Sequence, residues 1–488
     1  MTRLSITALR LAKVLGTSAS LAILATQPVS AETLQEALLK AYQSNPTLTG
    51  ARAAQRATDE NVPIQKAAGR PSAQVSGSFT ESILKPTISF TSPQRTVDAQ
   101  AQLSVPIYSG GSVKNAIRGA KIRVDAGRAN LRGTEASVFS QVVAAYMDVI
   151  RDSAIVSLNR ANVGVLDVNL QATNDRFEVG DLTRTDIAQS QSRLALARSD
   201  LQTAEANLIR SRENYIALVG SPPENLETPP PLPGLPQSPD LAVQVAVADN
   251  PDILAAKKQR EAAVYDVKAA RAAAKPTLSA FTQAGYTNYL DTLGNQGGLQ
   301  INKASSAGVQ LTVPLYQGGR PAAQVRQQQA IESQAIEREI EAERSVISQV
   351  RASYASWQAS LQTIVSSQAA VDATLLSLEG VRAENSVGSR TILDILNAEQ
   401  EALNARVQLV SARRNAYVAG FSLLAAMGHA EADDLSLSGG ALYDPVLNYD
   451  RVKNKLLDWG GDPKPQPVAT RTVDTPAQNA MVAPDAAK

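Results

Sequence analysis

An internal duplication, in which the same residues recur 208 positions apart, constrains the fold of this chain more than any other feature. Leu103–Gly111 reads LSVPIYSGG, and Leu311–Gly319 reads LTVPLYQGG. The offset then stays constant as far as Gly220 and its partner Gly428. A long match without insertions favours continuous helices, because one extra residue rotates every later side chain by about 100°. The chain is therefore predicted to contain two copies of one rigid, mainly helical unit.

The composition fits long, thin helices better than a thick globular core. Only 4% of the 488 residues are aromatic, and the apolar residues are mostly Ala, Leu and Val. The net charge of +1 gives no reason to expect a nucleic-acid partner that needs a basic patch. Cysteine is absent and His429 is the only histidine, which leaves almost no route to Cys- or His-based metal sites or to Ser-His-Asp catalysis. We therefore expect no enzyme activity and no cofactor.

The first 31 residues have the three parts of a secretory signal peptide. Three basic residues precede a short apolar run over 14–25, and Val29–Ala31 supplies the small-x-small cleavage pattern. We expect the mature chain to begin at Glu32. No later stretch approaches the roughly 20 apolar residues of a transmembrane helix, so a membrane crossing would have to use β-strands.

Two stretches alternate between apolar and polar residues and predict β-hairpins over 72–108 and 277–316. Residues 97–107 and 307–315 carry apolar or small side chains at every odd position. Each run is close to the 9–11 residues, roughly, that a tilted membrane strand needs. The loop of the second hairpin is expected over 291–305. A soluble hairpin with one wet face has the same pattern, but the signal peptide and the duplication favour membrane strands.

Helical periodicity fills most of the remaining sequence. Proline is absent from 112–179, and a return helix over 185–218 repeats apolar or small residues at spacings of three and four, which is typical of coiled-coil packing. The opening helix of each repeat is interrupted at an Asn-Pro pair, at Asn45 and at Asn250. The opening and return helices together match the long helix in length, so we expect them end to end beside it.

These patterns predict a mainly α fold with an internal duplication and membrane β-strands. The tail is rich in Pro, Ala and Thr from Lys464 onward and is expected to be largely disordered. The expected parts are a signal peptide over 1–31, a first repeat over 32–220, a Pro-rich linker over 221–240, a second repeat over 241–435 and a C-terminal tail over 436–488.

Four strands cannot close a barrel by themselves. An open sheet edge in lipid would leave unpaired amides at several kcal/mol each, so closure requires several chains. A dimer would supply 8 strands and a trimer 12, and only the trimer leaves room for a lumen. The alternative is a soluble periplasmic coiled-coil scaffold or adaptor protein in which the hairpins are ordinary sheets.

The Val-Pro-Ile/Leu-Tyr-x-Gly-Gly segments, and above all Val387–Leu396 (VGSRTILDIL), resemble the TolC family of outer-membrane efflux ducts. The resemblance covers about Glu32 to Leu435. It implies a homotrimer whose 12-stranded β-barrel lies in outer-membrane lipid and stands on an α-helical tube in the periplasm. It also implies a periplasmic adaptor (membrane fusion) protein and an inner-membrane RND pump or ABC transporter as partners. Multidrug efflux and type I secretion use the same tube, and the sequence does not choose between them.

The resemblance also implies a constriction at the periplasmic tips. Carboxylates on the second return helix ring the constriction in that family, and Asp394 matches the first such position. Asn397 stands where a second Asp is common, one helical turn further on the same face. A trimer would place three Asp394 carboxylates around one axis and favour cations, with half the charge of a double ring.

Four further residues belong to the predicted tips. Arg390 and Asp186 carry opposite charges on facing tips, and we hypothesise that they help to latch the closed tube. Gly180 and Gly388 end the two long helices, and the resemblance implies that these small tips contact the adaptor.

Overall fold

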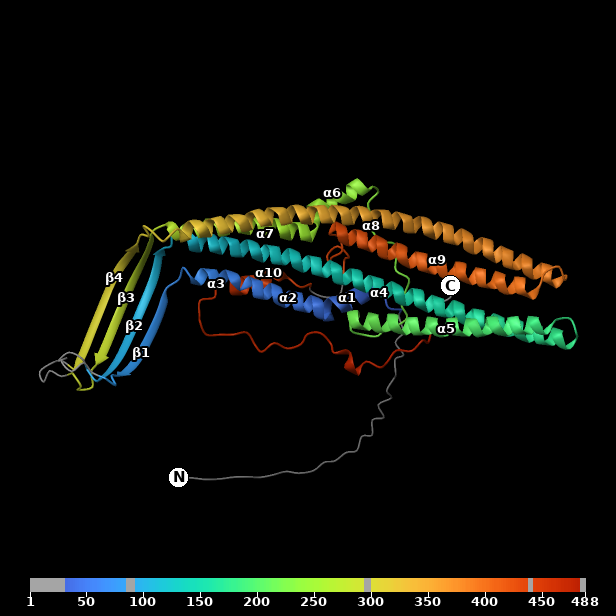
Figure 1. Ribbon diagram of the computed structural model, residues 1–488, viewed down its shortest axis with the longest axis horizontal. Helices are drawn as coiled ribbons and strands as arrows, with labels where there is room; N and C mark the ends of the chain where they lie inside the picture. Colours follow the sequence, from blue (N-terminus) through green and yellow to red (C-terminus); the bar gives the residue numbers. More distant parts are fainter. Residues whose placement is uncertain (1–30, 85–92, 294–299, 438–441, 483–488) are drawn as a thin grey trace, which may run out of the picture.

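The computed structural model describes residues 31–84, 93–293, 300–437 and 442–482. The molecule is elongated, with a β-sheet at one end and long helices that extend from it to two helical tips at the other (Figure 1). No helix in the described part of the chain combines the length and the apolar character needed to cross a membrane. The predicted signal peptide lies outside the described residues except for Ala31, and it stays a prediction.

The sheet contains four antiparallel strands in the order β1-β2-β3-β4. They are β1 (Ser72–Glu81), β2 (Arg95–Tyr108), β3 (Thr277–Asn288) and β4 (Ile301–Thr312). Both predicted hairpins are present, and the β2–β3 pairing joins the two repeats in one sheet. The second loop was predicted too long, because residues 301–305 pair with the end of β3 and already belong to β4.

The strand register collects the apolar side chains on one face of the sheet. Val75 pairs with Ala101, and Leu278 pairs with Leu311, so side chains of like character meet across the strands. Many of these side chains are exposed in the single chain, with Val75 at 81%. The outer edges of β1 and β4 have no partner strand among the described residues. The sheet therefore presents one bare apolar face and two open edges.

Two long helical hairpins make up most of the molecule. Helices α4 (Ser112–Glu178) and α8 (Arg320–Ser386) have 67 residues each, or about 100 Å at 1.5 Å per residue. Their return helices α5 (Arg184–Val219) and α9 (Ile392–Met427) have 36 residues each. Equal lengths in the two copies explain why the 208-residue offset is constant. The seams of the return helices are buried as the three-four spacing predicted, for example at Leu194 and Leu409.

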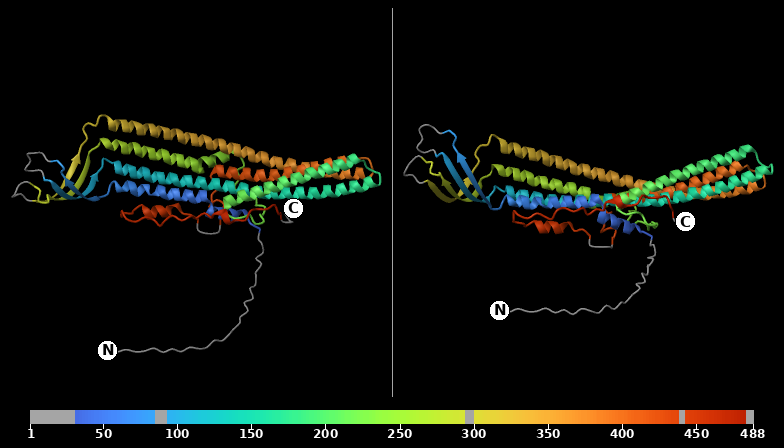
Figure 2. Two further views of the ribbon diagram at one scale, coloured as in Figure 1. Left: turned by 60° about the horizontal axis from the view of Figure 1, so that its bottom comes forward. Right: turned by 90° about the horizontal axis from the view of Figure 1, so that it is seen from below.

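Short helices pack beside the half of α4 and α8 that is near the sheet, and α5 and α9 pack beside the half that is near the tips (Figure 2). This is the predicted end-to-end arrangement beside the long helices. The first copy contains α1 (Leu34–Ser44), α2 (Pro46–Asp59) and α3 (Asn61–Ala67), and the second contains α6 (Pro239–Asp249), α7 (Pro251–Ala270) and a 3-10 turn over Arg271–Ala274.

The Asn-Pro pairs form the joints between the stacked helices. Asn45 caps α2 through its side-chain oxygen, and its Nδ2 donates to the carbonyl of Leu218 at the end of α5, at 2.9 Å. Asn250 repeats this arrangement in α7, with its Nδ2 donating to Ala426 of α9 at 2.9 Å. One buried amide therefore satisfies both helix ends at each joint.

Two equivalent tyrosines hold the linker between the repeats. The hydroxyl of Tyr146, fully buried in the main core, lies 2.6 Å from the carbonyl oxygen of Glu227. Its counterpart Tyr354 donates to the carbonyl of Gln237 at 3.0 Å. The Pro-rich linker is thus fixed near both ends against the two long helices.

The described part of the C-terminal tail packs against the first repeat. Residues 442–482 include helix α10 (Pro445–Val452) and a 3-10 turn over Thr472–Asp474, and they lie alongside the first repeat (Figure 1). The Asn448 amide donates to the buried Asp59 of α2 at 2.8 Å. Further along, Arg212 of α5 donates to the carbonyl of Met481 at 2.7 Å. The tail is held by backbone carbonyls, by side chains such as Asn448 and by apolar residues such as Val452, which is fully buried.

Candidate functional site at the helical tips and the repeat crossing

The two tips have the same backbone geometry. Gly180 and Gly388 take the left-handed conformation, with φ of +84° and +81°, immediately after α4 and α8. The first tip closes with two backbone hydrogen bonds, from Gly180 to Phe177 and from Asp181 to Arg176, both at 2.9 Å, and the second tip repeats them from Gly388 to Asn385 and from Ser389 to Glu384, both at 3.0 Å. A residue with a Cβ would be strained at these positions, which explains glycine at both tips. Nothing in the described chain lies within 4 Å of a Cβ built on either glycine, so both tips are open.

Asp186 and Asp394 have identical local roles at the starts of the return helices. The Asp394 carboxylate accepts from the Thr391 hydroxyl at 2.8 Å and from the Thr391 amide at 2.9 Å, and Asp186 does the same with Thr183. These are reciprocal helix caps. The hydrogen bonds from the Thr391 hydroxyl and amide lower the pKa of Asp394, and those from the Thr183 amide and hydroxyl lower the pKa of Asp186. Both carboxylates are exposed and ionised at neutral pH.

Arg390 forms its ion pair within its own hairpin. Its Nε donates to Glu384 Oε2 at 2.7 Å, and its carbonyl accepts from the Asn385 side chain at 2.7 Å. The hydrogen bond to Glu384 raises the pKa of Arg390. No contact joins Arg390 to Asp186 among the described residues of this single chain, so their latch stays a prediction about neighbouring subunits.

Asn397 joins the two hairpins instead of standing alone. Its Oδ1 accepts from Arg193 Nη2 of α5 at 2.6 Å. The preceding residue, Leu396, is buried in a small apolar cluster with Leu166 and Leu194 of the first hairpin. This pair could not be predicted, because its members lie 204 positions apart in different repeats.

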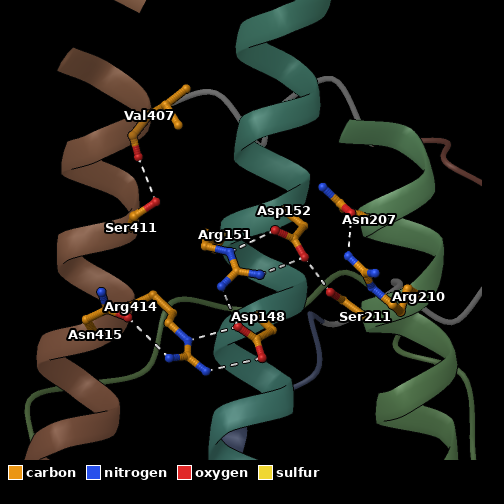
Figure 3. A network of polar contacts seen from close by, with 10 residues as sticks. All are labelled: Asp148, Arg151, Asp152, Asn207, Arg210, Ser211, Val407, Ser411, Arg414 and Asn415. Atoms are coloured by element: carbon orange, nitrogen blue, oxygen red, sulfur yellow. Dashed lines mark hydrogen bonds and ion pairs between the residues drawn. The ribbon is translucent and has the colours of Figure 1, made fainter. Parts of the chain in front are cut away.

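A polar network crosses three helices further from the tips (Figure 3). Arg414 of α9 lies 2.9 Å from Asp148 of α4, and Arg151 lies 2.8 Å from the same carboxylate. Arg151 also donates to Asp152 at 2.8 Å and 3.0 Å, and the Ser211 hydroxyl of α5 donates to Asp152. The pKa of Arg151 is raised, and the main cause is its hydrogen bond to Asp152. The network thus ties the second hairpin to the first.

This network has no equivalent at the matching positions of the duplication. The residues 208 positions after Asp148 and Asp152 are Ser356 and Ser360, and the residue 208 positions before Arg414 is Ala206. The α4–α9 crossing inside one chain therefore has charged contacts that the related positions do not repeat. A comparison of the two copies could not have singled out the network, because neighbouring positions such as Val149 and Trp357 differ between the copies as well.

Two antiparallel helical hairpins, open tips and a four-stranded sheet with a bare apolar face define the subunit of an outer-membrane export channel with a periplasmic helical domain. The chain belongs to the outer membrane efflux protein family, whose sequence profile matches residues 37–221 and 242–429, one segment for each repeat. This membership decides against the alternative of a soluble scaffold. The chain is a transport protein and not an enzyme.

Known relatives agree with this assignment. The outer membrane efflux protein BepC of Brucella suis is 35% identical over 440 residues, which cover 90% of this chain and 94% of that protein. The outer membrane protein TolC of Escherichia coli is 29% identical over 350 residues, covering 67% and 70% of the two chains. Among solved structures, the CmeC outer membrane channel of Campylobacter jejuni superposes with a TM-score of 0.71 at 17% identity, covering 86% of this chain and 89% of that one. The sequence-based expectation of a TolC-like export channel in the outer membrane is confirmed.

Proposed function

We propose that this efflux channel is a homotrimer whose 12 strands form one barrel in the outer membrane and whose hairpins form one tube in the periplasm. The observation that carries the proposal is the sheet with its open β1 and β4 edges and its exposed apolar face. Unpaired edges in lipid are costly, and pairing β4 of one subunit with β1 of the next removes them. Three subunits give enough strands for a lumen, whereas eight strands would be filled by side chains.

The trimer would close at its tips through Asp394, Asn397, Arg390 and Asp186. Three Asp394 carboxylates around the axis would favour cations, and their lowered pKa keeps them ionised. The Asn397–Arg193 bond supports a closed arrangement, because it holds the second return helix against the first hairpin. Arg390 would exchange Glu384 for Asp186 of a neighbouring subunit.

The open tips at Gly180 and Gly388 would receive a periplasmic adaptor protein. An adaptor with its own helical hairpin could contact the exposed backbone there, because no side chain covers it. Through the adaptor, an inner-membrane RND pump or ABC transporter would supply the cargo. We propose small toxic compounds and type I secreted proteins as the two cargo classes.

Deletion of the gene tests the function. We expect the deletion strain to become sensitive to several unrelated toxic compounds, to lose specific secreted proteins, or both, and plasmid-borne wild type should restore the phenotype. In outer-membrane fractions the protein should run on gels as a trimer that heat converts to a monomer. A monomer found in the aqueous extract without detergent would refute the trimeric barrel.

A further inference from the structure

The junction between the sheet and the helices is strongly basic. The four stretches 61–71, 109–124, 267–276 and 313–331 contain eleven Lys and Arg residues and no Asp or Glu, although the whole chain carries only +1. Arg123 pairs with Asp266, and none of the other ten forms an ion pair within the described residues. We name these ten the basic collar; they are Lys66, Arg70, Lys114, Arg118, Lys121, Lys268, Arg271, Lys275, Arg320 and Arg326.

The C-terminal tail contacts two members of the basic collar, Lys66 and Arg70. Lys66 Nζ donates to the carbonyl of Lys453 at 2.7 Å and to Asn454 Oδ1 at 3.1 Å, and Arg70 donates to the carbonyl of Lys455 at 2.6 Å. Partial burial, followed by the charges of Lys121, Arg70 and Lys453, lowers the pKa of Lys66. Lys453 itself pairs with Asp450 at 2.7 Å. The basic collar and Lys453 thus lie close together here, and only Lys453 has an acidic partner among the described residues.

The basic collar lies where the apolar strands end. Tyr108 and its counterpart Tyr316 are exposed at 51% and 88% on the chain segments that enter α4 and α8, and Leu315 is exposed at 93%. Exposed aromatic side chains next to basic ones are typical of a membrane–water interface. Helix α4 begins at Ser112, so Lys114 to Lys121 lie within about 15 Å of the strand end along the helix. Long Lys and Arg side chains can reach lipid phosphates from there.

We propose that the basic collar binds the phosphate groups of anionic phospholipids in the leaflet that faces the helical domain. This inference rests on the proposed function, because it requires the strands to lie in the membrane. We infer a phospholipid and not a small soluble anion, because the cations lie beside the exposed apolar strands and not in a cleft. The tail contributes by holding Lys66 and Arg70 in place through its carbonyls.

Native mass spectrometry of the full-length channel, purified in detergent, tests the proposal. Cardiolipin or phosphatidylglycerol is added to wild type and to the triple variant K66Q/R70Q/K121Q, with phosphatidylcholine as the zwitterionic comparison. Each cation near an anionic surface strengthens lipid binding about fivefold, so the loss of three cations should weaken the binding of anionic lipid at least about tenfold. Phosphatidylcholine binding should be the same in both. Inorganic phosphate at millimolar concentration should not displace the bound lipid.

The matched control is R338Q/R344Q/R351Q, which removes from α8, away from the sheet, three exposed arginines that form no ion pair with any described residue. It should bind anionic lipid as wild type does, and the charge-retaining variant K66R/R70K/K121R should recover most of the binding. Equal binding of anionic and zwitterionic lipid, an unaffected triple variant, or an equal loss in the control would overturn the proposal. Displacement by inorganic phosphate would identify a free anion site instead. All variants should still migrate as heat-dissociable trimers; a wild type that never does so contradicts the proposed function itself.

Discussion

At the residue scale, comparing the two tip aspartates distinguishes a residue that only caps a helix from one that also supplies charge to the channel. Asp186 and Asp394 make the same hydrogen bonds to the threonine three residues before them. The Thr-x-x-Asp spacing could have been recognised from the sequence as a capping box, and it gives each carboxylate a structural reason to be present. Only a property that the two residues do not share can reveal a role in conduction.

We predict that Asp394→Asn reduces cation selectivity in planar bilayers, whereas Asp186→Asn does not. Both changes weaken the same cap, so their effects on thermal stability should be similar. Because its pKa is lowered in the folded protein, Asp394 stays ionised to a lower pH than an ordinary aspartate, so the cation selectivity of wild type should not change between neutral and mildly acidic pH. If both variants change selectivity equally, Asp394 has no special place at the constriction.

Glu135 of α4 predicts a pH dependence of stability. Its carboxylate accepts from the amide of Ala432 at 2.7 Å, and burial, with a contribution from Glu431, raises its pKa to about 7. The folded state therefore binds a proton that the unfolded state releases near pH 4.5, so this site stabilises the fold at low pH and its contribution is lost as the pH rises toward 7.

We expect wild type to lose roughly 1–3 kcal/mol from this site between pH 4.5 and 8. Glu135→Gln, which keeps the hydrogen-bond acceptor but cannot titrate, should flatten that part of the profile. Thermal unfolding measured at several pH values compares the two proteins. An unchanged slope in the variant would assign the pH dependence to other groups.

At the element scale, the helices were predictable and the contacts between repeats were not. Helix lengths follow from the absence of proline over 112–179 and from the constant offset, since both properties are local or periodic. The Asn45 and Asn250 joints were visible as interruptions, but their bonds to the opposite helix end were not. The contacts that the tail makes through its carbonyl groups could not be predicted, because a backbone acceptor carries no sequence signal.

The network at the repeat crossing predicts a local loss of stability. Arg414→Gln removes the contact between α9 and Asp148 and leaves a carboxylate that is only 23% exposed with one fewer cation. A partly buried charge-assisted contact of this kind contributes about 1–3 kcal/mol. The unfolding midpoint should fall accordingly.

The neighbouring Arg413 provides the control for this change. It is exposed, and Gln368, at 3.5 Å, is the only hydrogen-bond partner of its side chain in the part of the chain that the structure describes. Arg413→Gln should leave the midpoint within error of wild type. A drop of the same size in both variants would show that the loss is a general charge effect and not a property of the crossing.

At the scale of the whole molecule, the closed state depends on whether the tips are held within each subunit or between subunits. In the single chain Arg390 is paired with Glu384, and an ion pair this exposed contributes little, because solvent screens it. Such a weak contact can be exchanged for Asp186 of a neighbour without much loss. Three symmetric copies would then add their small contributions around one ring.

Single-channel conductance distinguishes the two arrangements. If the latch lies between subunits, Arg390→Ser and Asp186→Asn should both raise conductance, because each removes one side of the same contact, while Glu384→Gln should leave it unchanged or lower it by freeing Arg390 for the latch. If the pair with Glu384 holds the tip, Glu384→Gln should raise conductance as Arg390→Ser does, and Asp186→Asn should have no effect. Unchanged conductance in Arg390→Ser would remove the latch altogether and leave the buried contacts of Leu396 and the Asn397–Arg193 bond to keep the tube closed.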